Sequence, residues 1–201
     1  NNVLRGNDSL STATIQNVDA RYEFYPSAAE MVSVGLFYKR FTNPIEMFYL
    51  PGAGSGGTRN FTFGNAREAT SIGAEVEVRR QLSGIFTTGY LSRLGVMFNA
   101  AYIVTEVRLG EGAQGQARQR PLMGQSPYIV NAGLYYQDTE HKLQYSVLYN
   151  VIGRRLFAVG TYGTPDIYEM PRNVLDVAIT KEIGQRFEVK LAAQDILNQR
   201  V

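Results

Sequence analysis

The sequence predicts an all-β fold: an antiparallel up-and-down transmembrane β-barrel, of which this chain supplies about eight strands. Three observations support this prediction. Apolar and polar residues alternate with a period of two in eight segments, and no segment has a convincing helical period. The connections between these segments are alternately short and long. Aromatic residues stand at the segment ends, as they do in the interfacial girdles of membrane barrels.

Four alternating segments lie in the first half of the chain and four in the second. Residues 70–80 show the pattern clearly, because one parity is wholly apolar and the other carries two carboxylates and a guanidinium. Such a strand has one face for an apolar environment and one for water. In chain order, the predicted strands are residues 17–26, 30–41, 70–80, 93–104, 127–137, 142–151, 173–182 and 186–197.

The connections differ in length according to their place in this series. They are short after the first, fifth and seventh strands, and intermediate between the third and fourth, at Gln81–Leu91. The long connections are Thr42–Ala66, Glu106–Ser126 and Gly153–Met170. In an up-and-down sheet this alternation places every long loop at one end. Bacterial outer-membrane barrels have the same asymmetry, with short periplasmic turns and long extracellular loops.

The polar parity of the strands is expected to line a water-filled lumen, because a membrane barrel turns its apolar side chains toward lipid. A soluble sandwich or a lipocalin-like barrel also alternates, but with its apolar side inside. Periodicity does not separate these alternatives; loop asymmetry, unbroken alternation and aromatic strand ends favour the membrane barrel. The residues predicted to face the lumen are Lys39, Glu75, Glu77, Arg79 and Asp176.

The composition excludes several classes of protein. The 20 Lys+Arg and 18 Asp+Glu are spread along the chain and give a net charge of +2. The sequence therefore has no cluster of basic residues of the kind that binds nucleic acid. The absence of cysteine excludes disulfides, thiolate zinc sites and cysteine nucleophiles. No apolar run approaches the roughly 18 to 20 residues of a membrane helix. The chain begins at Asn1 without a visible targeting signal, so we expect that it was processed or is part of a longer polypeptide.

The residue pattern indicates no catalytic or metal-binding constellation. Glu75 and Glu77 lie two residues apart on a strand, but no nucleophile accompanies them, so we interpret them as lumen residues. His141 is the single histidine and lies in the predicted turn "DTEH", where a surface role is expected. The stretch Gly52–Gly57 lacks the Lys-Ser/Thr of a phosphate-binding loop and is interpreted as a flexible extracellular loop. We predict no enzyme activity, no metal and no cofactor.

The long loops carry basic and aromatic residues that could converge over the mouth of the barrel. Loops on a rigid scaffold commonly carry binding, and guanidinium groups suit anionic or hydroxyl-rich ligands. The alternative is that these residues solubilise the loops or contact lipopolysaccharide. The ligand-binding candidates are Phe48, Tyr49, Arg59 and Phe61 in the first long loop, Arg118 and Arg120 in the second, and Arg154, Arg155 and Tyr162 in the third.

Five segments resemble, in the same order, parts of the C-terminal third of TonB-dependent outer-membrane receptors, particularly those of Bacteroidetes. The most specific is "RPLMGQSPYIVNAGLYYQ" at residues 120–137, which resembles the entry to a late barrel strand. The others are "FYKRFTNPIE" (37–46), "SIGAEVEVRR" (71–80), "YNVIGRRL" (149–156) and "AAQDILNQ" (192–199). The resemblance covers essentially the whole chain.

This resemblance implies that residues 1–201 are the C-terminal segment of a single outer-membrane barrel domain of about 22 strands, without its plug and last strand. It implies an active importer that binds a scarce nutrient of the siderophore, cobalamin, glycan or peptide class at its extracellular loops. TonB would supply the energy through a plug segment not in this chain. Other expected partners are outer-membrane lipid and lipopolysaccharide, but not nucleic acid. Some members of the family also have a surface lipoprotein partner, and the sequence leaves that partner open. The alternative functions are a passive porin or structural barrel, and a soluble lipocalin-like binding barrel.

Overall fold

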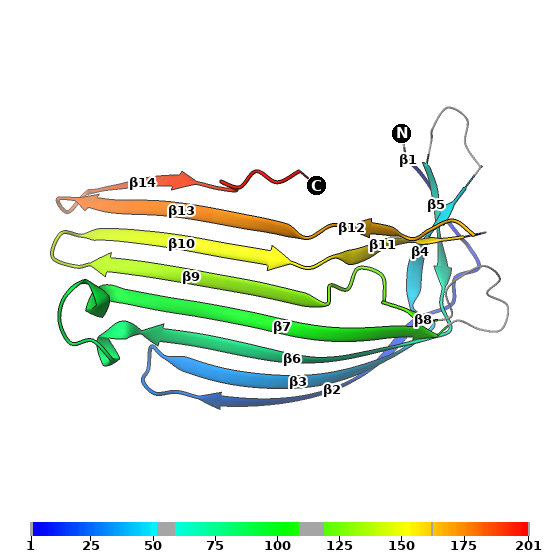
Figure 1. The fold of residues 1–201 in the computed structure, drawn as a ribbon, viewed down its shortest axis with the longest axis horizontal. Coiled ribbons are helices and arrows are strands. Elements are labelled where there is room, and N and C mark those ends of the chain that lie inside the picture. Colours follow the sequence, from blue (N-terminus) through cyan, green and yellow to red (C-terminus); the bar gives the residue numbers. More distant parts are fainter. Residues whose placement is uncertain (1, 52–58, 109–118, 162, 201) are drawn as a thin grey trace.

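The computed structural model describes residues 2–51, 59–108, 119–161 and 163–200. Its main element is one antiparallel sheet in which the long strands lie side by side in chain order (Figure 1). The eight predicted strands are confirmed. They are β2 (Thr14–Phe24), β3 (Met31–Thr42), β6 (Glu68–Gln81), β7 (Leu94–Arg108), β9 (Tyr128–Asp138), β10 (Leu143–Ile152), β13 (Arg172–Ile183) and β14 (Phe187–Ala193).

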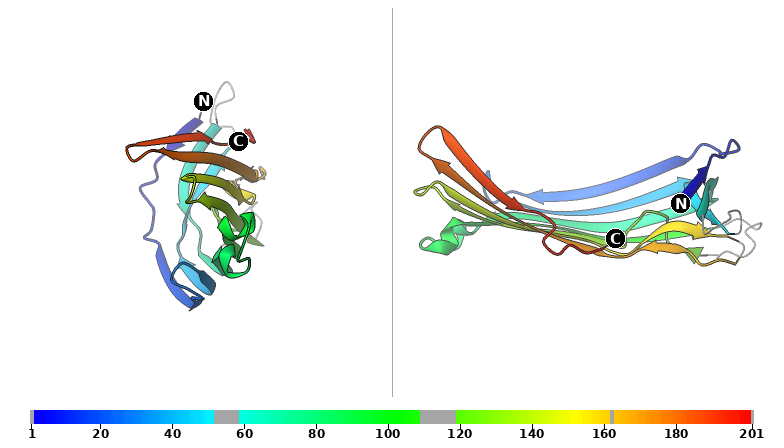
Figure 2. Two further views of the ribbon diagram at one scale, coloured as in Figure 1. Left: turned by 90° about the vertical axis from the view of Figure 1, so that its left-hand side faces the viewer. Right: turned by 90° about the horizontal axis from the view of Figure 1, so that it is seen from above.

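The sheet is curved and open, with β2 and β14 at its edges (Figure 2). An exposed strand edge presents unpaired N–H and C=O groups, and each such group costs several kcal/mol in hydrocarbon. A sheet of this kind therefore needs further strands to stand in a membrane. The architecture agrees with the prediction that the chain supplies part of the wall of a larger barrel.

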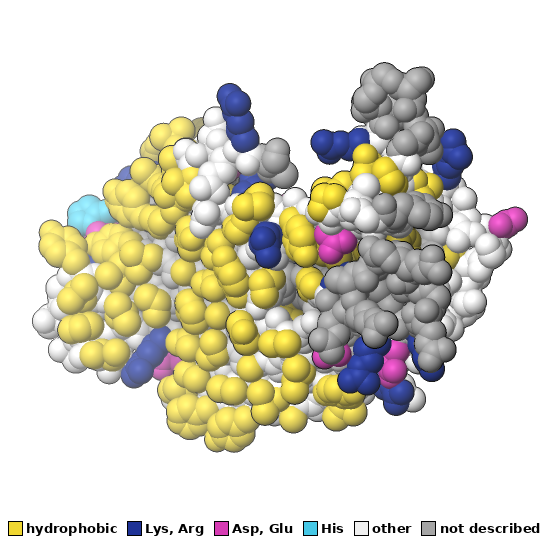
Figure 3. All heavy atoms as spheres, turned by 45° about the vertical axis from the view of Figure 1, so that its right-hand side comes forward, with side chains coloured by type: hydrophobic (Ala, Val, Ile, Leu, Met, Phe, Trp, Pro, Cys, Tyr) yellow, Lys and Arg dark blue, Asp and Glu magenta, His cyan; other side chains and the backbone are white. Residues whose placement is uncertain are grey.

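The two faces of the sheet have opposite chemistry, and the apolar face is the exposed one. Leu36 is 60% exposed and Ile72 is 58% exposed, whereas Ser33 and Ser71, on the other parity of the same strands, are almost completely buried. Figure 3 shows hydrophobic side chains spread over the strands, with few charges among them. Water-soluble sheets bury their apolar face, so this arrangement suits a wall that turns its apolar side to lipid.

The polar face carries the residues that were predicted to face the lumen. Directly paired residues project from the same side of a sheet, and Lys39 pairs with Ser71, one of the buried polar positions. Asp176 lies in one cross-strand row with Arg79, through Leu148, Gly133 and Met97. A second row is a ladder of amides: Asn131 donates to Asn99 (3.3 Å) and Asn150 donates to Asn131 (2.6 Å).

The short connections lie at one end of the sheet. The intermediate connection between β6 and β7 lies at the same end and contains the 3₁₀ helices η1 (Leu82–Gly84) and η2 (Tyr90–Arg93). No helix in the described parts of the chain is both long enough and apolar enough to cross a membrane.

The long connections, at the opposite end, contain short strands that the sequence analysis treated only as loops. Together with the N-terminal strand β1 (Asn2–Arg5) they form a second sheet, which we call the loop sheet. Its strands in order are β1, β5 (Arg59–Asn65), β4 (Ile45–Leu50), β11 (Arg155–Gly160) and β12 (Ile167–Glu169). A further strand, β8 (Gln119–Arg120), pairs with the end of β7. The predicted flexible stretch Gly52–Gly57 lies outside the described residues. These strands are short and pair across different loops, so local alternation does not reveal them.

We expect Leu36→Arg to destabilise the wall, because it places a charge in the middle of β3 on the apolar face. A charged residue on the lipid face costs about 2–4 kcal/mol near the bilayer midplane. The matched change Glu75→Arg, on the polar face of the adjacent strand, should leave the free energy of unfolding nearly unchanged. Urea unfolding of the full-length protein in lipid vesicles measures both. Equal costs would contradict the assignment of the two faces.

Candidate functional site

The loop sheet is the candidate functional site, because it is the structured element at the end of the wall where the long loops gather (Figure 1). It joins segments from separate loops. The β4–β5 hairpin comes from the first long loop, and β11 from the third loop pairs with β4 in parallel through Val159 with Phe48 and Gly160 with Tyr49. The N-terminal strand β1 adds to β5, also in parallel. Backbone pairing between loops gives a more rigid platform than independent loops provide.

A buried ion pair joins the second long loop to this sheet. Arg120 donates from Nη1 to Oε1 of Glu46 (2.8 Å) and from Nη2 to Oε2 of the same carboxylate. Both side chains are almost completely shielded from solvent, at 2% and 0% exposure. An uncompensated buried charge is strongly destabilising, so each group requires the other. Arg120 was predicted to bind ligand, but its guanidinium is buried and paired with the Glu46 carboxylate.

Other hydrogen bonds extend this junction to the third loop. The Glu46 carboxylate also accepts from the Met123 backbone N–H (3.1 Å). One residue later, the Gly124 N–H donates to the Leu156 carbonyl in β11 (2.8 Å). Glu46 thus lies where segments from all three long loops meet.

An aromatic cluster lies on the loop sheet. The rings of Tyr49 and Phe61 have centroids 5.7 Å apart, and Phe157 from β11 packs edge-on against Phe61 at 6.1 Å. Phe61 is buried, whereas Phe157 is 45% exposed. Phe48 packs over Gly64, where a Cβ atom would stand 2.9 Å from the ring. The structure therefore brings together the predicted residues Tyr49 and Phe61 and adds Phe157 as the ring that reaches solvent. Phe48 pairs with Thr62 and lies on the opposite face of the loop sheet.

The predicted basic residues of the loops have different surroundings. Arg59 is exposed at the start of β5. Arg155 makes a bidentate pair with Glu169 (2.8 and 3.1 Å), and its hydrogen bond to that carboxylate raises the pKa of the guanidinium. Arg154 instead stacks over the ring of Tyr168, with 4.5 Å between its guanidinium carbon and the ring centroid. Arg118 and Tyr162 lie outside the described residues.

The sequence analysis did not identify the partners of these side chains. Glu46, Phe157, Tyr168 and Glu169 were not selected as candidates. Glu46 had a recognisable signal, because it is the one charged residue in the otherwise apolar run "IEMFYL" and an acid in such a run needs a buried donor. Its donor lies 74 residues away in the chain, so the pairing itself could not be read from the sequence.

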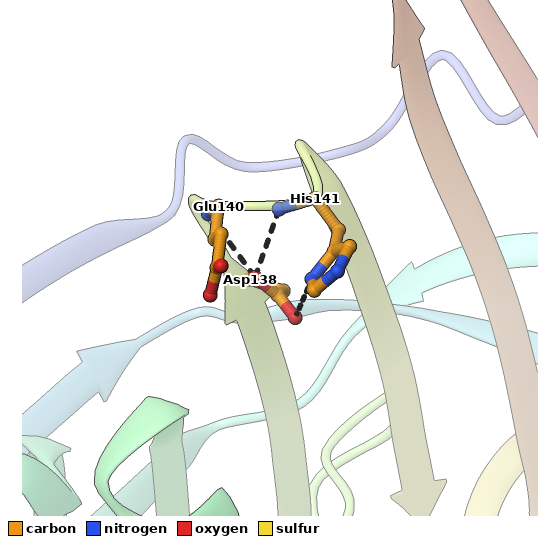
Figure 4. A group of neighbouring side chains, drawn as sticks. All are labelled: Asp138, Glu140 and His141. Atoms are coloured by element: carbon orange, nitrogen blue, oxygen red, sulfur yellow. Dashed lines mark hydrogen bonds and ion pairs between the residues drawn. The ribbon is translucent and has the colours of Figure 1, made fainter.

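At the opposite end of the wall, the β9–β10 turn brings together Asp138, Glu140 and His141 (Figure 4). One potential ligand atom from each lies within 4.8 Å of the others, which is a spacing that a metal site could use. The Asp138 carboxylate is already engaged. Its Oδ1 accepts the backbone N–H groups of Glu140 (3.1 Å) and His141 (3.0 Å), and its Oδ2 lies 3.0 Å from Nδ1 of His141.

A guanidinium occupies the side of this turn that faces η2. Arg93 donates to Oδ2 of Asp138 (2.6 Å) and lies 3.6 Å from the Glu140 carboxylate. This cation neutralises the charge that would attract a metal ion, and the Asp138 hydrogen bonds are those of a capped turn. The geometry favours a structural role, in which Arg93 fixes the β6–β7 connection to the neighbouring turn.

Comparisons with known proteins agree with this architecture. Residues 1–195 match the family model "TonB dependent receptor-like, beta-barrel". A search of curated proteins found no match. Among solved structures, a mutant of the ferric enterobactin receptor PfeA from Pseudomonas aeruginosa superposes with a TM-score of 0.63 at 17% identity, over 98% of this chain and 27% of that one.

Two further solved structures have similar scores. The FrpB iron transporter from Neisseria meningitidis gives a TM-score of 0.62 at 12% identity, over 98% of this chain and 28% of that one. The siderophore receptor PirA from Acinetobacter baumannii gives 0.60 at 14% identity, over 98% of this chain and 29% of that one. The chain therefore spans less than a third of the length of these proteins.

We expect Glu46→Ala to loosen the junction of the loops, because it leaves the Arg120 guanidinium buried without a counter-charge. Breaking a buried pair in this way costs about 3–5 kcal/mol. Hydrogen exchange of residues 119–124 in the full-length protein should accelerate accordingly. The double change Glu46→Met with Arg120→Leu removes both charges and should restore most of the protection. Equal exchange in the single and double variants would show that the ion pair does not hold the segment.

Proposed function

The chain belongs to the TonB-dependent receptor-like β-barrel family, and we propose that it forms part of a receptor that captures a scarce nutrient and imports it with energy supplied through TonB. The family is one of outer-membrane proteins, and the chain is accordingly an outer-membrane protein. Its exposed apolar face and polar opposite face suit that location.

The ordered loop sheet is the main structural support for the proposed receptor function. A receptor needs a binding surface that stays ordered outside the membrane, and functional residues are commonly held on loops positioned by a rigid scaffold. Here Phe157 is solvent-exposed over a buried aromatic base, and Arg59 stands exposed on the same sheet. An exposed aromatic ring and an exposed guanidinium on the same sheet suit a ligand that combines flat apolar groups with negative charge.

Ferric siderophores are the first ligand class to test among the siderophore, cobalamin, glycan and peptide classes. The three solved structures are described as receptors or transporters for ferric enterobactin, iron and siderophores. Their low sequence identity does not transfer a ligand, so the choice rests on the chemistry of the loop sheet together with these names.

The remaining partners and the domain boundaries are also part of the proposal. We infer that residues 1–201 form the C-terminal part of one barrel domain, and that a plug elsewhere in the longer protein contacts TonB. Lipopolysaccharide is proposed as a surrounding lipid. A surface lipoprotein partner and a Bacteroidetes origin stay predictions.

The two alternative functions differ in how well they fit the wall. A soluble lipocalin-like barrel would bury its apolar side chains, and the apolar face of this sheet is exposed. A passive porin would have the same wall, so only measurement separates it from an active importer.

Energy dependence is the decisive test. Cells that express the full-length protein should accumulate ferric siderophore only when TonB is present, because transport needs energy from the inner membrane. Uptake that is unchanged without TonB would contradict the proposal. In planar bilayers the purified full-length protein should be closed, and a constitutively open channel would favour the porin.

We expect Phe157→Ala to weaken binding of the transported ligand by about two- to tenfold, since an aromatic contact contributes roughly 0.5–1.5 kcal/mol beyond its buried area. Equilibrium titration of the full-length receptor measures the change. Phe187→Ala is the matched control, because Phe187 is also exposed but begins β14 at the opposite end of the wall. Equal effects of the two substitutions would remove Phe157 from the binding surface.

A further inference from the structure

The polar face of the wall contains a hollow of about 460 Å³ near the short connections. It is lined by the ends of β6, β7, β9, β10 and β13 that lie closest to those connections, together with Lys190 of β14. We call it the wall hollow. It lies at the end of the sheet opposite the loop sheet, which is the periplasmic end of an outer-membrane barrel (Figure 1). A nutrient that leaves the loop sheet for the periplasm passes this end of the wall.

The strand register places the polar side chains of the wall hollow on one face of the sheet. Arg79 shares a cross-strand row with Asp176, and Gln81 follows Arg79 by two residues, so both belong to the polar face. The row of Gln81 continues to Tyr135 and Ser146. The next row on the same face consists of Gln137, Gln144, Thr180 and Lys190.

Residues of the opposite parity also line the wall hollow, namely Arg80, Val96, Tyr136 and Tyr145. Consecutive side chains of a strand point to opposite faces, so these four residues reach the hollow only through their backbone. The wall hollow is therefore a feature of the polar face alone.

Small side chains leave the space that forms the wall hollow. In the row of Gln81, the residues on β7, β10 and β13 are Gly95, Ser146 and Ala178. Tyr135 belongs to the same row, but its ring lies over Gly133, where a Cβ atom would stand 3.0 Å from the ring. The tyrosine ring therefore lies along its own strand and leaves the hollow open.

Two exposed cations stand in different rows of the wall hollow. Lys190 makes no ion pair with any residue that the structure describes, and it lies in the row of Gln144. The guanidinium of Arg79 is 3.9 Å from the Glu77 carboxylate, which also pairs with Arg21 at 3.1 Å. One carboxylate shared between two arginines leaves the hollow with an excess of positive charge.

The other acids near the wall hollow do not cancel this charge. Asp176 accepts a hydrogen bond from the Asp195 backbone N–H (2.8 Å), and Glu182 lies 3.6 Å from the Lys142 amine. Glu188 precedes Lys190 by two residues, toward the turn, and does not line the hollow. The lining itself contains no carboxylate.

Neutral hydrogen-bonding groups complete the lining. They are the side-chain amides of Gln137 and Gln144 and the hydroxyls of Ser146 and Thr180. Within the described part of the chain none of these four side chains is engaged in a side-chain hydrogen bond. Cations together with free amide and hydroxyl donors suit a small molecule that carries several anionic oxygens, because charge-assisted hydrogen bonds are the strong ones.

We propose that the wall hollow is a second binding site on the route of import, which holds the anionic oxygens of the nutrient after it leaves the loop sheet. Arg79 and Lys190 supply the charge, and Gln137, Gln144 and Thr180 donate hydrogen bonds. The site has the same charge preference as the exposed guanidinium of the loop sheet, so one negatively charged ligand fits both. This inference rests on the proposed import function and adds a step to it.

Thiol labelling of Ser146→Cys in the full-length receptor tests the charge of the wall hollow. Ser146 lines the hollow, and residues 1–201 contain no native cysteine. A sulfonate-bearing methanethiosulfonate should react faster than the trimethylammonium reagent, after correction for their rates with a free thiol. Arg79→Gln combined with Lys190→Gln should lower this ratio about threefold or more, because two nearby charges are lost. Arg186→Gln is the matched control, since it removes an exposed cation from the β13–β14 turn and should leave the ratio unchanged.

Protection of the same thiol tests whether the ligand occupies the wall hollow. In cells that import a ferric tris-catecholate, labelling of Ser146→Cys should slow only when TonB and the ligand are both present. Arg79→Gln combined with Lys190→Gln should remove most of this protection, and Arg186→Gln should retain it. Full protection in the double variant, or no protection while wild-type uptake continues, would overturn the site. A wild-type receptor without TonB-dependent uptake would instead contradict the proposed function.

The resting receptor separates the ligand from a segment of the same polypeptide as the occupant. If an acidic segment of the longer protein filled the wall hollow, the double variant would react faster with both reagents in the absence of ligand. That result would overturn the assignment to the nutrient. Failure of position 146 to react with either reagent would show that the hollow is closed to small solutes and would overturn it as well.

Discussion

The constraint on which the wall depends is that a membrane strand must pair all its backbone groups while its two faces meet different surroundings. The six inner strands meet it through antiparallel pairing in chain order, whereas β2 and β14 each leave one edge open. Because side chains alternate, a slip of one residue would turn every apolar side chain toward the lumen. The cross-strand row of Asn99, Asn131 and Asn150 illustrates this register, which brings the three amides within hydrogen-bond distance of one another in sequence across the strands.

Beyond the membrane the constraint is relaxed, and the chain uses other means to stay ordered. The long strand β10 stops at Gly153, and its continuation joins the loop sheet. There the Glu46–Arg120 pair ties the loops together. A buried ion pair adds little net stability, but each partner specifies the position of the other. We interpret the pair as the element that selects one arrangement of the long loops.

The surfaces of the chain suit separate tasks. The polar face suits the lumen of a barrel, the loop sheet carries exposed Phe157 and Arg59, and the exposed apolar face suits contact with lipid. Arg154 and Arg155 illustrate how the surroundings change from one residue to the next: Arg154 stacks on Tyr168, and Arg155 pairs with Glu169. Two adjacent arginines thus belong to different environments, although the sequence alone groups them together.

The sequence by itself determined the strands, their order, their two faces and the end at which the loops gather, because alternation and connection length are local properties. It selected Tyr49 and Phe61, which pack together, but it also grouped Phe48 with them, which lies on the other face of the same strand. Only the tertiary structure showed what the loop arginines contact: Arg120 is buried against Glu46, and Arg154 stacks on Tyr168. Their partners come from other loops or from beyond a turn, and such pairings depend on how the chain closes in space rather than on any local period.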